Sequence, residues 1–169
     1  IILYDTTNFF TYFEEPLRSQ LAKTGHNKAS RHHLKQVGLA ICVEKEWGIP
    51  LFHRLYRGNS HDTATFPEVI VELMQQMKAN LSSIENLVLV LDKGNNSEDN
   101  FSLLEDKIQF VGSLVPAHYS DLMKIPLSSY SGCFKSWHYY SSHRKVMGMD
   151  CKVVLTYYQP LAKKQKLTL

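Results

Sequence analysis

Two aspartates, Asp5 and Asp92, each follow an apolar stretch, a position in which carboxylates often bind ligands or metal ions. Asp92 follows the apolar residues 87–91, and Asp5 follows the largely apolar residues 1–4. An unbroken apolar run bounded by turn formers predicts a strand buried on both faces. In α/β sheets, ligands bind at the carboxyl ends of such strands. If the two strands are parallel neighbours, about 4.8 Å apart, Asp5 and Asp92 face each other across a gap that suits a metal ion.

Paired carboxylates of this kind suit the cleavage or transfer of phosphodiesters. Mg²⁺ is a hard cation that binds carboxylate, water and phosphate oxygens, so neither His nor Cys is needed. Two such ions, roughly 3.5–4 Å apart, activate the attacking oxygen and stabilise the leaving one. Asp5 and Asp92 are therefore the predicted catalytic and metal-binding residues, for Mg²⁺ or Mn²⁺. The alternative is that these acids only cap or form turns, as strand-end aspartates often do.

The residues after Asp92 favour a turn beside the predicted site. Lys93 and Asn95 are predicted to contact DNA phosphates or to hold the acid in place. Gly94 lets the backbone turn away from the strand. Formation of the turn itself explains the amide side chains equally well.

Positive charge is distributed unevenly along the chain. The net charge is only +3, yet the stretch from Pro16 to Val43 holds no Asp or Glu. Basic stretches suit the phosphate backbone of nucleic acids. Lys28, Arg31 and Lys35 are therefore predicted DNA-binding residues. An ordinary solvated loop has the same composition, and the sequence does not separate the two interpretations.

Composition excludes several classes of protein. No apolar run approaches the roughly 20 residues that span a bilayer, and no signal-peptide pattern begins the chain. The three cysteines are widely spaced and form no CxxC motif, which indicates a reducing compartment and predicts a cytoplasmic location. Because the chain opens on Ile1, already inside a predicted strand, we expect it to be a fragment or a processed piece.

The order of elements predicts an α/β fold with a mixed sheet. Apolar or alternating stretches predict strands at residues 1–10, 37–43, 49–56, 86–91 and 108–115. Thr65 and Glu68 have the spacing of a capping box, and Pro67 fits a first turn, which predicts a helix from Thr65 to Leu81. Ser97 is predicted to cap a second helix. The resulting order, β-β-β-α-β-α-β, is that of a ribonuclease-H-like mixed sheet, in which the first and fourth strands are parallel neighbours.

The texture of the sequence changes near residue 116. Residues 1–116 are predicted to form a partial ribonuclease-H-like catalytic core. Residues 117–169 are polar and aromatic with weak periodicity, except that the apolar residues within 152–158 predict a strand. They are predicted to form a β-rich insertion or subdomain.

Several short motifs together resemble one protein family. They are Tyr-Asp-Thr-Thr at 4–7, Val-Leu-Asp-Lys-Gly-Asn-Asn-Ser at 90–97, the stretch Gly-Ile-Pro to Ser-His-Asp at 48–62, Val-Gly-Ser-Leu-Val-Pro at 111–116 and Val-Val-Leu-Thr-Tyr at 153–157. In order and spacing they resemble the DDE-class insertion-sequence transposases whose ribonuclease-H-like core is interrupted by a β-strand insertion. The resemblance covers nearly the whole chain.

This resemblance implies a DNA transposase that cuts and joins DNA at insertion-sequence ends with a divalent metal. The implied partners are transposon-end and target DNA, with a homodimer in the synaptic complex and no membrane. Asp5 and Asp92 match the first two catalytic acids of the family. The third acid, the Glu of a helical Tyr-x2-Arg-x3-Glu pattern, has no match, because Tyr140 and Arg144 are wrongly spaced and position 148 is Gly. We therefore expect the chain to be truncated before the third acid, which leaves the activity of this piece alone open.

Two other functions fit the same residues. One is a catalytically inactive, DNA-binding transposase remnant, which the missing third acid favours. The other is a ribonuclease-H-like, metal-dependent nuclease with a different third ligand.

Overall fold

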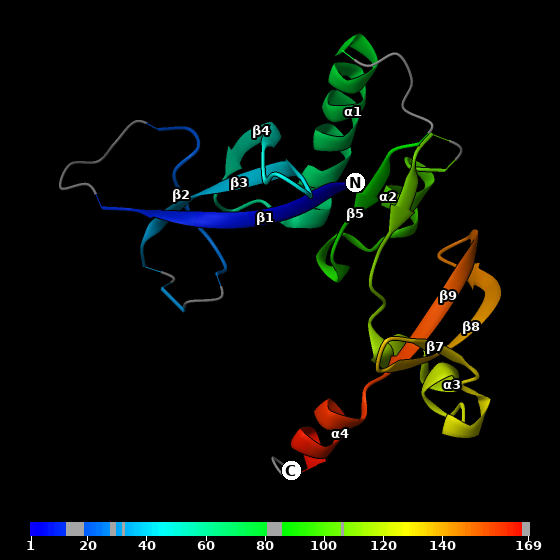
Figure 1. The fold of residues 1–169 in the computed structure, drawn as a ribbon. Helices are drawn as coiled ribbons and strands as arrows, with labels where there is room; N and C mark the ends of the chain where they lie inside the picture. The colour runs from blue at the N-terminus through cyan, green and yellow to red at the C-terminus, as the bar shows by residue number, and fades with distance from the viewer. Residues whose placement is uncertain (13–18, 28–29, 32, 81–85, 106, 167–169) are drawn as a thin grey trace. The chain divides into compact units, whose positions relative to one another are not determined.

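A computed structural model describes residues 1–12, 19–27, 30–31, 33–80, 86–105 and 107–166. The chain divides into two compact units, Ile1–Ser113 and Leu114–Leu169. The first unit combines a mixed sheet with helices, and the second contains a separate antiparallel sheet (Figure 1). The predicted α/β class with a mixed sheet is therefore confirmed.

The antiparallel half of the first sheet is a set of long strands. β1 (Ile2–Thr11) pairs with β3 (Lys35–Glu44), and β3 pairs with β4 (Pro50–Arg57). A short β2 (Lys23–Thr24) joins the beginning of β3. The turn between β3 and β4 is stabilised by the carboxylate of Glu44, which accepts hydrogen bonds from the backbone N–H groups of the two residues after Lys45.

The parallel half of the sheet lies on the other edge of β1. There β1 pairs with β5 (Val88–Val90), and β5 pairs with β6 (Gln109–Val111). The five predicted strands are all present, and the predicted parallel neighbours, β1 and β5, are adjacent. β5 and β6 are shorter than predicted, with three residues each.

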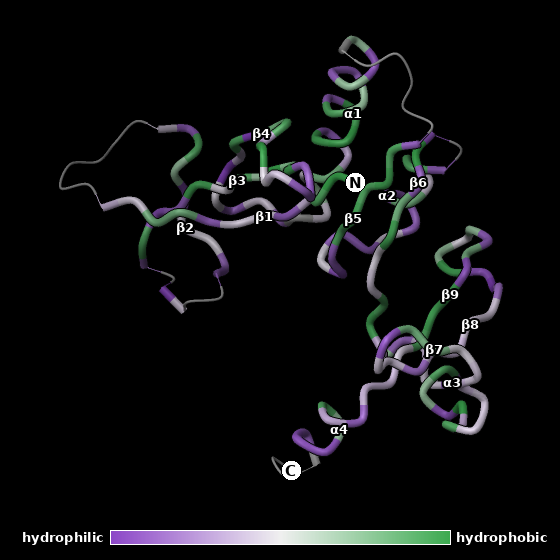
Figure 2. Tube along the Cα trace, viewed as in Figure 1, coloured by the Kyte–Doolittle hydropathy of each residue, from purple (hydrophilic) through white to green (hydrophobic). Residues whose placement is uncertain are grey.

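The helix α1 (Asp62–Asn80) packs its predicted apolar face against the first sheet. Phe66 is fully buried and meets the ring of Tyr4 edge-on, with 5.3 Å between ring centroids. Figure 2 shows hydrophobic residues on β5 and on the part of α1 beside the sheet. The other buried residues of this face are Val69, Ile70, Leu73, Met74 and Met77.

The predicted start of this helix is wrong. The helix begins at Asp62, three residues before Thr65, whose hydroxyl donates to the carbonyl of His61 at 3.2 Å instead of capping. The carboxylate of Glu68 binds Arg54 of β4 at 2.5 Å, so it does not complete a capping box. Pro67 consequently lies in the second turn rather than the first.

The predicted second helix is present but short. Ser97 caps α2 (Glu98–Ser102), because its hydroxyl accepts the N–H of Asn100 at 3.1 Å. Phe101 and Leu104 are buried, although Leu104 lies beyond the helix end. A 3-10 turn, η1 (Lys93–Asn95), connects β5 to this helix.

The second unit has its own small core. Leu122, Val146 and Val153 are buried together. Asp121 and Arg144 form an ion pair at 2.6 Å. Tyr140 and Arg144 lie in a strand, so the imperfect Tyr-x2-Arg pattern is not on a helix here. The elements are η2 (Pro116–His118), α3 (Ser120–Met123), η3 (Leu127–Ser129), β7 (Gly132–Phe134), β8 (Trp137–Val146), β9 (Met149–Tyr157) and α4 (Gln159–Lys166).

The strands of this unit form an antiparallel sheet in the order β7-β8-β9. The strand predicted at 152–158 is thereby confirmed as β9. Whether the unit is an insertion in a larger catalytic domain remains a prediction.

Candidate functional site

The two predicted catalytic aspartates lie at matching positions on neighbouring parallel strands. Ile2 pairs with Leu89, and Leu3 pairs with Val90. The same register, continued by two residues, sets Asp5 opposite Asp92. Asp92 keeps an extended backbone (φ −89°, ψ 174°), so the strand direction continues to this residue.

Both aspartates belong to the sheet face that α1 does not cover. Side chains alternate between the faces of a strand. In β1, Ile2 and Tyr4 are buried on the helix side, whereas Leu3 and Asp5 are exposed. Beside it, Leu89 and Leu91 are buried and Asp92 is exposed. The two carboxylates are therefore on the same, solvent-accessible face.

Each carboxylate uses only one oxygen within the described part of the chain. Oδ1 of Asp5 accepts the N–H of Thr6 at 2.8 Å. Oδ1 of Asp92 accepts the N–H of Gly94 at 2.6 Å. The second oxygen of each group has no hydrogen-bond donor among these residues, so the pair offers the oxygen ligands that a hard divalent cation prefers.

A complete ligand set is not assembled by the described residues alone. Among them, no three His, Cys, Asp or Glu side chains gather into a group that could hold a metal ion. Two carboxylates supply fewer oxygens than the roughly six that Mg²⁺ requires. The donor chemistry thus fits a divalent ion, and the remaining positions would fall to water, phosphate or further protein ligands.

The two predicted DNA-contacting residues in the turn after Asp92 differ in exposure. Lys93 is exposed, beside the acid. Asn95 is only 2% exposed, so its side chain lies beneath the surface that DNA would meet. Asn96 ties the turn to the end of β6, since its amide donates to the carbonyl of Ser113 at 2.8 Å. The Asn96 amide therefore holds the turn. The buried side-chain oxygen of Asn95 has no hydrogen-bond partner among the described residues, and the role of Asn95 stays a prediction.

The predicted basic residues lie at the far end of β1. Arg31 donates to the hydroxyl of Tyr12 at 2.9 Å, and its guanidinium lies 5.5 Å from the centroid of the Phe10 ring. Lys35 is exposed opposite Thr11. Because a strand rises about 3.4 Å per residue, Thr11 is roughly 20 Å from Asp5 along β1. Lys28 lies outside the described residues.

Comparison of the sequence with protein-family models and with curated proteins finds no match. Two solved structures are similar to the chain. One is a Mos1 transposase paired-end complex with left transposon end, with a TM-score of 0.45 and 12% identity, over 72% of this chain and 37% of that one. The other is a Mos1 mariner paired-end complex with Mn, with a TM-score of 0.47 and 10% identity, over 68% and 36%.

The chain thus spans just over a third of the length of those transposase chains. What the two aspartates can do follows from their own surroundings in this chain.

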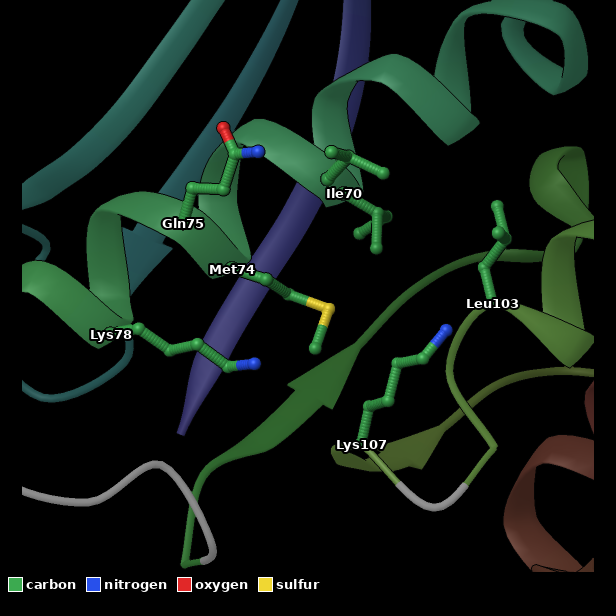
Figure 3. Close-up of a pocket in the computed structure, with 7 residues that line it drawn as sticks. Ile70, Met74, Gln75, Lys78, Leu103 and Lys107 are labelled. Carbon is green, nitrogen blue, oxygen red and sulfur yellow. The ribbon is translucent and has the colours of Figure 1, made fainter.

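A groove of about 210 Å³ beside α1 is separate from this site (Figure 3). It lies between α1, which covers the opposite face of the sheet, and the segment that follows α2. No carboxylate is among its described lining residues. Its lining residues are Ile70, Val71, Met74, Gln75, Lys78, Leu103 and Lys107. None of the described helices is long and apolar enough to cross a membrane.

Sequence reasoning missed one residue next to the candidate site. Asn100 is 2% exposed, and its amide bonds both to α1 and to the turn after Asp92. Its position within a short polar helix gave no local signal for these contacts. The available hint was Pro67, whose place inside a helix requires another donor for the carbonyl of Thr63.

Proposed function

We propose that this chain is the catalytic core of a DNA transposase, built on a ribonuclease-H-like sheet. Asp5 and Asp92 hold a divalent cation, Mg²⁺ or Mn²⁺, against a DNA phosphate. The observation that carries this proposal is the register that sets the two acids opposite each other, on the open face of two parallel strands. The DDE-like motifs around them support the same assignment.

Each residue of the site has a defined task in this proposal. Asp5 and Asp92 each present one oxygen to the cation, while their other oxygens are fixed by backbone N–H groups. Such a cation, when bound, activates the attacking oxygen and stabilises the leaving oxygen of a phosphodiester. Lys93, exposed next to Asp92, approaches the same phosphate.

The DNA substrate extends along β1 toward the basic segment. Arg31 and Lys35 contact phosphates there. Lys28, outside the described residues, is a further proposed DNA contact. The roughly 20 Å between these residues and Asp5 matches about six base pairs of B-DNA at 3.4 Å per step. In the full reaction the DNA is the end of an insertion sequence and its target, and two copies of the protein act in the synaptic complex.

A catalytically inactive DNA-binding remnant is the second candidate. It is favoured by one observation, that the described residues bring no third acidic ligand to Asp5 and Asp92. A metal-dependent nuclease of the same fold would need such a third ligand as well.

Mn²⁺ binding tests the proposed metal site. We expect Asp5→Asn and Asp92→Asn each to weaken Mn²⁺ binding about tenfold or more, because each removes a charged ligand. Glu46→Gln, in the exposed turn after β3, is the matched control and should bind Mn²⁺ normally. Unchanged Mn²⁺ affinity in both aspartate variants would contradict the proposed site.

The nature of the products separates the three functions. A transposase joins the cut end of its element to a second duplex in Mg²⁺. A nuclease nicks without joining, and a remnant binds DNA with the same affinity in Mg²⁺ and in EDTA while cutting nothing.

A further inference from the structure

Asn100 connects three elements around the candidate site. Its side-chain amide donates to the carbonyl of Thr63 in α1 at 3.2 Å and to the carbonyl of Asn95 in η1 at 3.0 Å. Its own backbone N–H is fixed by the hydroxyl of Ser97. The residue is 2% exposed; its bond to Asn95 is buried, and its bond to Thr63 is partly buried. A buried side chain in this position sets the distance between α1 and the turn after Asp92.

The bond to Thr63 exists because of Pro67. In a regular helix the N–H of residue 67 would donate to the carbonyl of Thr63, four residues earlier. Proline has no N–H, so this carbonyl lacks its helical partner. Asn100 supplies the missing donor. Even for a partly buried carbonyl, loss of the hydrogen-bond partner costs free energy, which explains why an amide is placed here.

The bond to Asn95 continues directly to the candidate catalytic acid. The N–H of Asn95 points to the carbonyl of Asp92 at 3.5 Å, and the N–H of Gly94 donates to the Asp92 carboxylate at 2.6 Å. The orientation of the Asp92 carboxylate thus depends on the shape of η1. That shape is held by Asn100 on the α1 side and by Asn96 on the β6 side.

We propose that Asn100 is a positioning residue for Asp92, acting by clamping η1 to α1. The effect on metal binding by Asp92 rests on the proposed function. The hydrogen bonds that clamp η1 to α1 do not depend on it. Aspartate cannot replace Asn100, because an ionised carboxylate has no donor and would face two carbonyl oxygens. Alanine would remove the donor from the buried Asn95 carbonyl and from the partly buried Thr63 carbonyl.

The experiment separates positioning from stabilisation by means of a second substitution. Pro67→Ala restores an N–H for the Thr63 carbonyl, so α1 no longer needs Asn100. In this background, Asn100→Ala leaves only the Asn95 carbonyl without its donor. We expect the Gly94 amide to exchange with solvent about tenfold faster in the double variant than in Pro67→Ala, the effect of losing one supporting hydrogen bond.

Mn²⁺ affinity of the full chain is the second measurement. It should fall about tenfold in the double variant by the same reasoning, while Pro67→Ala alone binds Mn²⁺ as the unmodified chain does. Exchange of amides in the β1–β3 ladder should not change, which excludes general loosening. Asn59→Ala, an exposed asparagine in the loop after β4, is the control for the substitution itself.

Each outcome decides between the roles. Normal Gly94 exchange and normal Mn²⁺ affinity in the double variant would overturn the proposal. They would show that Asn100 serves only as a hydrogen-bond donor to α1. If the unmodified chain does not bind Mn²⁺, the proposed function fails, yet the Gly94 exchange still tests the clamp. If the double variant does not fold, Asn100→Ser in the Pro67→Ala background keeps one donor and is read by the same two measurements.

Discussion

Asp5, inside β1, and Asp92, just after β5, differ from the strand-end acid Glu44 in the use of their oxygens. Glu44 ends β3, and both of its carboxylate oxygens accept hydrogen bonds from the following turn. Its role is to form that turn. In contrast, each aspartate has one oxygen engaged by its own backbone and a second one directed to no described donor. Asp92 also caps η1 through its bond to Gly94, so the feature that distinguishes both aspartates from Glu44 is a second oxygen without a described donor.

The pH dependence of the β3–β4 hairpin tests the role of Glu44. Backbone N–H groups of Glu46 and Trp47 hold the pKa of Glu44 below its usual value of 4.5. A lowered pKa in the folded state means that the stabilisation is present above about pH 4.5 and is lost as the pH falls through the folded pKa. Glu44→Gln should therefore flatten the pH dependence of urea unfolding between about pH 3 and 5. Glu46→Gln should not, and an equal effect of both variants would contradict this role.

The cysteines give a second prediction at the scale of single residues. Burial raises the pKa of the Cys42 thiol to about 12, whereas Cys133 is exposed. Only the thiolate reacts with alkylating reagents. At pH 8, mass spectrometry after iodoacetamide treatment should find Cys133 modified first and Cys42 modified only after unfolding. Rapid modification of Cys42 in the folded chain would show that the centre of β3 is accessible.

At the scale of elements, local sequence patterns predicted which strands and helices form. The residue at which the helix α1 begins depends on contacts with residues distant in the sequence. The strands and the apolar face of α1 follow from periodicity, so the sequence was sufficient for them. The start of α1 was predicted wrongly because Glu68 binds Arg54 of another element instead of its own helix end. Pro67 is accepted in the second turn because Asn100, more than thirty residues later, replaces the lost donor. Neither partner can be identified from a local window of sequence.

The packing of α1 on the sheet is tested by a pair of substitutions on one helix. Phe66 is fully buried against Tyr4, and Val71 is 46% exposed. Phe66→Ala should lower the free energy of unfolding by about 3–5 kcal/mol, because it removes apolar contacts and leaves a cavity. Val71→Ala should cost less than about 1 kcal/mol, since little of its surface is buried. Denaturation in urea measures both, and similar losses would place α1 differently on the sheet.

At the scale of the first unit, α1 and the acidic pair define two different faces of one sheet. The face without α1 carries Asp5 and Asp92 and exposes Leu3, Leu55 and Val111. DNA that reaches both acids must approach this face and extend along β1 to reach the basic segment. The sequence predicted the acids and the basic stretch separately. Their relation depends on strand order and register, which no local motif contains.

Salt dependence tests whether DNA follows this path. Each Lys or Arg that neutralises a phosphate adds about 0.9 to the slope of log affinity against log salt concentration. Replacing both Arg31 and Lys35 with Ala should weaken binding to all DNA sequences alike and reduce this slope by about 1.8 if both contact phosphates. Fluorescence anisotropy with a labelled duplex, from low to moderate salt, measures the slope for each variant.

The matched control removes positive charge from the other side of the same sheet. Lys78 lies on α1, beside the groove in Figure 3, and would not meet DNA bound along the open face. Lys78→Ala changes the net charge as one basic substitution does, so a general charge effect would appear in it as well. Lys35 pairs with Thr11 on the face of Asp5, whereas Arg31 lies over Phe10, which alternation puts on the other face. A slope that falls for Lys35→Ala but not for Lys78→Ala therefore assigns DNA to the face that bears Asp5 and Asp92. Equal slopes in all variants would show that the basic segment is an ordinary solvated loop. They would also contradict the proposal that DNA extends from the two acids along β1.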